Sequence, residues 1–82
     1  MSYGLKQTTS TKAFDLTRLE LIGLTLAANG LNAFETASRL SVSEAEIEAA
    51  LSSAELKLGA GNRMHAITVA IQQGLIGIEV KG

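Results

Sequence analysis

Apolar residues recur at helical spacing in four segments of the chain, and each segment opens at a residue whose side chain can cap a helix. These capping residues are Thr17, Asn32, Ser43 and Asn62. In the first segment Glu20 stands three residues after the cap, which is the spacing of a capping box. Glycines at positions 30, 59 and 74 are typical helix stops. The pattern predicts helices near residues 15–29, 32–39, 43–57 and 62–74.

Four helices with short connections predict an all-α fold with a single small core, since 82 residues bury only about 60% of their unfolded surface. We expect residues 1–13 to be a flexible tail, residues 14–78 to be the domain and residues 79–82 to be a C-terminal tail. The one strand-like stretch, IGIEV at residues 76–80, is short enough to be the frayed end of the domain.

The amino-acid composition excludes several classes of function and of structural site. The net charge of −1 argues against a dedicated polyanion binder, and the absence of cysteine excludes disulfides and thiolate metal sites. The longest charge-free run, residues 64–78, is shorter than the ~20 apolar residues of a membrane span, and no signal peptide is evident. We therefore expect a cytoplasmic protein without a membrane partner.

No catalytic or metal site is expected. His65 is the single histidine, no second strong ligand stands near it, and no nucleophile is paired with a base. The sequence therefore predicts neither an enzyme nor a bound cofactor or metal.

The second and third segments have helix-turn-helix spacing. Ala37 is small, Leu40 and Val42 follow it, and Ile47 lies ten residues after Ala37. A generic helical hairpin shares much of this spacing, so the motif alone has modest specificity.

A longer comparison is more specific, because residues 16–76 resemble a LuxR-type (GerE-like) helix-turn-helix domain without a gap. The matching positions are Leu16, Thr17, Glu20, Ala28, Gly30, Leu31, Glu35, Ala37, Leu40, Ser43, Ile47, Lys57, Leu58, Gly59, Asn62, Arg63, Ala66, Ile67, Ala70, Gly74, Leu75 and Ile76. The resemblance implies a four-helix DNA-binding domain of transcription regulation, whose third helix enters the major groove and whose fourth helix pairs two copies.

The third helix departs from the family where it would contact DNA. By resemblance, its DNA-facing positions are Ser43, Glu46, Glu48, Ala49, Ala50, Ser52, Ser53 and Lys57. The family's usual threonine, lysine and histidine are replaced by Glu46, Glu48 and Ala50. Glu46 can favour the positive end of the helix. Glu48 repels Glu44 one turn earlier, by ~0.2–0.5 kcal/mol, so we interpret Glu48 either as a solvated charge or as a group that faces a basic partner.

The fourth helix has an uncharged outer face instead of the usual lysines and glutamates. This face is predicted to contain Met64, His65, Thr68, Val69 and Gln72. We interpret it as a surface for a homodimer or a heterodimer with another regulator, with a merely neutral surface as the alternative.

Two functions of the chain remain consistent with the sequence. The chain is a transcription-regulatory domain whose DNA binding is weak or depends on a dimer or partner, or it is an interaction-only module that dimerises with another regulator without contacting DNA.

Overall fold

The computed structural model describes residues 15–77, and this part of the chain is all-α. It consists of α2 (Arg18–Ala28), α3 (Ala33–Leu40), α4 (Glu44–Lys57) and α5 (Arg63–Gln72). The four predicted helices and the fold class are therefore confirmed, although the predicted ends differ by up to three residues. The two predicted tails lie outside the described residues, as does most of the strand-like IGIEV stretch.

Capping side chains set the start of every helix. Thr17 is extended, its hydroxyl accepts from the Glu20 N–H at 3.1 Å, and the Glu20 carboxylate accepts from the Thr17 N–H at 2.8 Å. Because Thr17 is the cap, α2 begins at Arg18 and not at the predicted residue 15. The same reciprocal box opens α3 at Asn32 and α4 at Ser43, and a simple side-chain cap from Asn62 opens α5.

The helix ends share one local motif. A left-handed residue follows each helix, and the apolar residue after it donates its N–H to the carbonyl five positions earlier. The left-handed residues are Gly30, Ser41, Gly59 and Gly74. The three glycine stops were predicted. The serine was not, because a non-glycine residue at φ 59° leaves little sequence signal.

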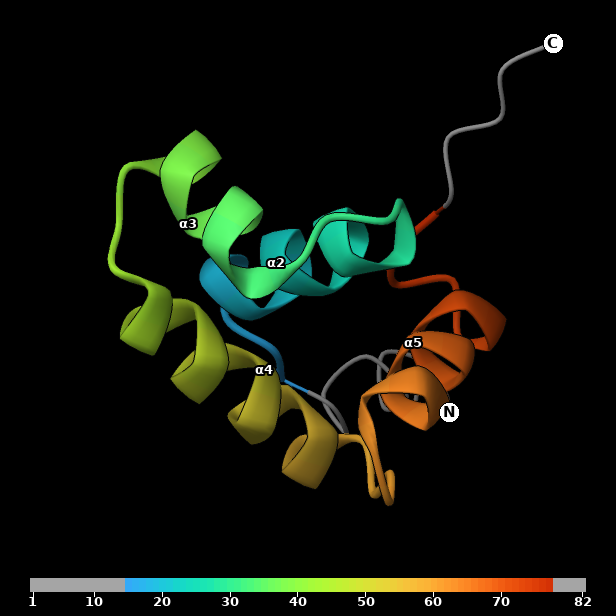
Figure 1. The fold of residues 1–82 in the computed structure, drawn as a ribbon. Helices are drawn as coiled ribbons and strands as arrows, with labels where there is room; N and C mark the ends of the chain where they lie inside the picture. Colours follow the sequence, from blue (N-terminus) through green and yellow to red (C-terminus); the bar gives the residue numbers. More distant parts are fainter. Residues whose placement is uncertain (1–14, 78–82) are drawn as a thin grey trace, which may run out of the picture.

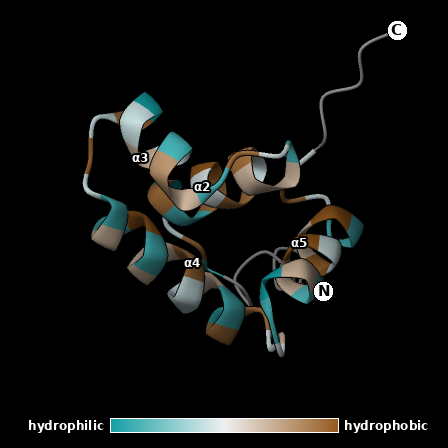
Figure 2. Ribbon diagram, viewed as in Figure 1, coloured by the Kyte–Doolittle hydropathy of each residue, from teal (hydrophilic) through white to brown (hydrophobic). Residues whose placement is uncertain are grey.

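Helices α2 and α4 form the centre of the domain, and α3 and α5 each pack against both of them (Figure 1). Apolar side chains from all four helices meet in the space between the helices. Along α4, hydrophilic and apolar residues alternate (Figure 2). The buried core contains Leu24, Ala37, Ile47, Leu51, Ala54, Leu58, Ala66 and Ala70.

One glycine has a role inside a helix. Gly23 is buried in α2, and a Cβ added there would lie 3.3 Å from a methyl group of Leu51 in α4. The missing side chain lets the two central helices approach closely, which fixes α4 on the domain so that its other side faces outward.

Candidate interface on helices α4 and α5

Most positions that the sequence assigned to a DNA-facing surface do lie on the exposed side of α4. Six of them are exposed and Ser53 is half-buried. Ala50 is the exception, because only 9% of it is exposed. It stands three residues after Ile47 and four before Ala54, both buried, so helical periodicity turns it toward the core. The prediction that Ala50 faces DNA is therefore corrected.

Lys57, the one basic residue of α4, is exposed but forms an ion pair within the domain. Its Nζ lies 2.9 Å from Oε1 of Glu20 and 3.3 Å from the carbonyl oxygen of Asp15. The Glu20 side chain is only 5% exposed, whereas that of Lys57 is 34% exposed. The lysine thus neutralises a nearly buried carboxylate at the start of α2, and this ion pair competes with any contact between Lys57 and DNA.

The environment of Glu20 keeps its carboxyl group ionised. Burial acts to raise the pKa, but it is outweighed by the hydrogen bond from the Thr17 backbone, by hydrogen bonds with Lys57 and Ser53, and by the charge of Lys57. The net result is a pKa below the ordinary glutamate value. Ser53, predicted to face DNA, therefore also interacts with a neighbour inside the domain.

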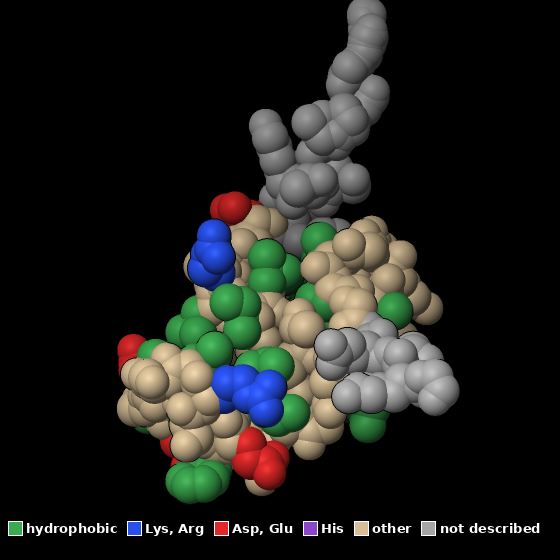
Figure 3. Space-filling view, turned by 90° about the horizontal axis from the view of Figure 1, so that it is seen from above, with side chains coloured by type: hydrophobic (Ala, Val, Ile, Leu, Met, Phe, Trp, Pro, Cys, Tyr) green, Lys and Arg blue, Asp and Glu red, His purple; other side chains and the backbone are tan. Residues whose placement is uncertain are grey.

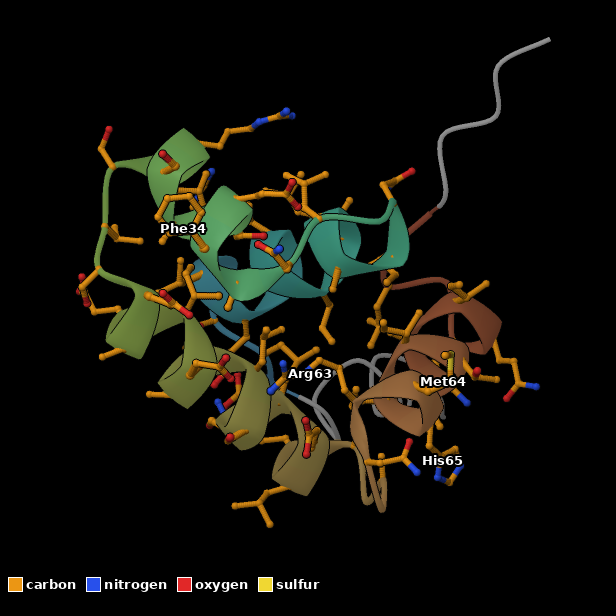
Figure 4. All side chains as sticks on the ribbon, in the orientation of Figure 1. Phe34, Arg63, Met64 and His65 are labelled. Atoms are coloured by element: carbon orange, nitrogen blue, oxygen red, sulfur yellow. The ribbon has the colours of Figure 1, made fainter. Side chains whose placement is uncertain are left out.

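Arg63 connects the start of α5 to α4. Its Nη2 lies 3.2 Å from Oε1 of Glu48, and its Nε lies 3.2 Å from Oε2 of Glu55. In Figure 4 the Arg63 side chain reaches back toward α4, whereas Met64 and His65 point away from it. Glu48 was expected to be either a solvated charge or a group facing a basic partner. It faces a basic group of its own domain, a contact that spacing along one helix could not reveal.

These ion pairs leave the exposed side of α4 acidic. Glu46 is used in the α4 capping box, Glu48 and Glu55 hold Arg63, and the Glu44 side chain makes no hydrogen bond or ion pair within residues 15–77. Charged side chains are scattered on the face seen from above, with hydrophobic side chains between them (Figure 3). Neither feature resembles the continuous basic surface that follows a nucleic-acid backbone.

The outer face of α5 matches its prediction in part. Met64 is 73% exposed, and His65, Thr68 and Gln72 are exposed as well. Val69 is half-buried and packs against the core, so only part of its side chain lies on this face. Ile71, which was not part of the predicted face, is 37% exposed. The outer face of α5 is therefore uncharged, and Ile71 adds apolar surface to it.

The described part of the chain contains neither a metal-binding group of side chains nor a membrane-spanning helix. No three or more histidine, cysteine or acidic side chains are grouped there so that they could hold a metal ion. His65 Nδ1 lies 3.5 Å from the backbone nitrogen of Gly61, which donates to it. None of the helices in residues 15–77 is long and apolar enough to cross a membrane.

A comparison with known proteins adds a direct relative. Over 64 residues the chain is 41% identical to the Transcriptional regulatory protein YdfI of Bacillus subtilis (strain 168). The chain is similar to a transcriptional regulator. The match covers 78% of this chain but only 30% of YdfI, so the chain spans less than a third of the length of that relative. No protein-family model matches the chain.

Proposed function

We propose that this chain is a LuxR-type helix-turn-helix module of transcription regulation, which acts as a dimer or beside another regulator and binds DNA only weakly by itself. The similarity to YdfI supports the regulatory role, because the match includes nearly four-fifths of this chain. The four-helix fold agrees with the resemblance of residues 16–76 to that class of domain. Such a role belongs in the cytoplasm.

One observation supports weak DNA binding above all others. Lys57, the one basic residue of α4, and Arg63, at the start of α5, are both engaged in ion pairs inside the domain. A phosphate that binds Lys57 would compete with Glu20, and one that binds Arg63 would compete with Glu48 and Glu55. Since each neutralised phosphate adds about 0.9 to the slope of log affinity against log salt, the proposal predicts a shallow slope.

An interaction-only module is the second candidate, and the outer face of α5 favours it. Met64 and Ile71 expose apolar surface on a helix whose outer side has no charge after Arg63 within the described residues. A surface of this kind suits a second α5 helix, either from another copy or from a related regulator. In this alternative the acidic α4 makes no contact with DNA at all.

A titration of the full chain with random-sequence duplex DNA at low and moderate salt separates these functions. Weak binding with a slope of about 1 or less supports a regulator that needs a second copy or a partner. Binding that is undetectable at low salt supports the interaction-only module. Nanomolar affinity with a steep slope contradicts both, since it requires several phosphate contacts that the ion pairs leave unavailable.

A further inference from the structure

Arg63 occupies a position in α5 where a cation needs compensation. It is the first residue of the helix, directly after the Asn62 cap, and the N-terminal end of a helix dipole is positive. The two carboxylates of α4 supply the missing negative charge. Part of the acidity of α4 therefore exists to balance one arginine of the same domain.

The two carboxylates have different places around the guanidinium. Glu55 is the inner one, with a side chain 22% exposed, and it accepts from Nε. Glu48 is the outer one, with a side chain 51% exposed, and it accepts from Nη2. Glu55 thus orients the arginine toward α4, while the more exposed Glu48 holds Nη2.

We propose that Glu48 masks a phosphate-binding arginine: its carboxylate occupies, as an intramolecular counter-ion, the Arg63 nitrogen that would otherwise bind a backbone phosphate of duplex DNA. The inference rests on the proposed function, which turns the exposed side of α4 toward nucleic acid. Carboxylates and phosphates accept from the same guanidinium N–H groups, so the two anions compete for Nη2. The Glu48 carboxylate and a DNA phosphate therefore compete for Arg63, and in the present sequence Glu48 is bound to it.

The masking contact is separable from folding. Glu48 is exposed, takes no part in a helix cap, and shares Arg63 with Glu55, so its removal leaves the guanidinium held on the inner side. The pair between Lys57 and Glu20 lacks this property. Glu20 is nearly buried and completes the cap of α2, so releasing Lys57 would disturb the fold.

The test compares two single substitutions that remove the same charge. Glu48→Gln frees Nη2 of Arg63, whereas Glu44→Gln, one turn earlier on α4, removes a glutamate that holds no partner within residues 15–77. Each variant of the full chain is titrated with random-sequence duplex DNA over a range of salt, in the natural background and in an Arg63→Gln background. Helical circular dichroism and a thermal melt verify that every variant is folded.

Masking predicts that Glu48→Gln binds DNA more tightly than Glu44→Gln, with a salt slope steeper by about 0.9, the value for one added phosphate. In the Arg63→Gln background this advantage disappears, and the two substitutions become equivalent. Equal gains in the natural background, or no gain in either folded variant, overturn the proposal. The proposed function is judged separately, by the affinity and self-association of the unsubstituted chain.

Discussion

Lys57 and Glu20 stand 37 positions apart in the sequence, and their side chains meet at 2.9 Å. The contact joins the last turn of α4 to the first turn of α2. Oε1 of Glu20 also accepts the Thr17 N–H at 2.8 Å, so a single oxygen both caps α2 and fixes α4 against it. Local helix formation and tertiary packing thus depend on the same carboxylate.

Glu20→Gln is expected to lower the free energy of unfolding by about 1–3 kcal/mol, the range for hydrogen bonds to charged groups in a buried place. Glutamine can still complete the capping box, so the loss comes mainly from the contact with Lys57. Urea unfolding measures the change. Glu35→Gln is the matched control, because Glu35 occupies the same place in the α3 box but is exposed and has no ion pair within residues 15–77. An equal loss in both variants would contradict a special role for the ion pair.

Stability should also depend on pH through Glu20. Burial opposes ionisation of this group, yet the hydrogen bonds of Thr17, Lys57 and Ser53 hold its pKa below the ordinary value. Its contribution is therefore fully present above the unfolded-state pKa, about 4.3, and is lost as the pH falls through the lower folded-state pKa. Urea midpoints of the natural chain and Glu20→Gln should converge in that acidic range. A difference that stays constant from pH 7 to pH 3 would refute this.

The helices were predictable because their signals are local. A cap such as Ser43 and a stop such as Gly59 act on the turn next to them, so a few neighbouring residues determine where α4 begins and ends. Some errors at helix ends arise where a cap was counted as part of its helix, as at Asn32 and Ser43, or where a left-handed residue is not glycine, as at Ser41.

The charged contacts of the candidate site were not predictable in the same way. The partner of Glu48 is 15 positions away and that of Lys57 is 37 positions away, so both depend on how the helices pack. The partial burial of Val69 and the exposure of Ile71 on α5 were not predicted, for a related reason. The rotation of a helix about its axis is set by the neighbours it packs on, and α5 shows an apolar pattern too weak to fix that rotation.

Gly59→Ala is expected to destabilise the domain by about 1 kcal/mol, because φ at this position is +67° and an L side chain is strained there. Apart from the two adjacent residues, no atom of residues 15–77 lies within 4 Å of the added Cβ, so the cost comes from the backbone and not from a clash. Gly61→Ala, two residues later in the same turn, meets open space without a left-handed φ and should change stability by less than about 0.5 kcal/mol. Thermal melts of both variants measure the contrast. Equal losses of stability in the two variants would show that the cost comes from changing any residue of this turn, and not from the left-handed conformation of Gly59.

Met64→Glu is expected to weaken self-association if α5 forms the pairing surface. Met64 is 73% exposed, and an acidic residue in the first turn of a helix is favourable, so the monomer should remain folded. Burying the new carboxylate between two α5 helices costs more than about 1.4 kcal/mol, which is the free energy of a tenfold change in an association constant. The association constant should therefore fall at least about tenfold. This position is a cleaner test than Val69, whose substitution would also disturb the core. Sedimentation equilibrium measures the constant, with Leu56→Glu as the control, since Leu56 is an 82% exposed apolar residue on α4. A natural chain that is monomeric at every concentration, or an equal loss in the Leu56 variant, would exclude α5 as the pairing surface.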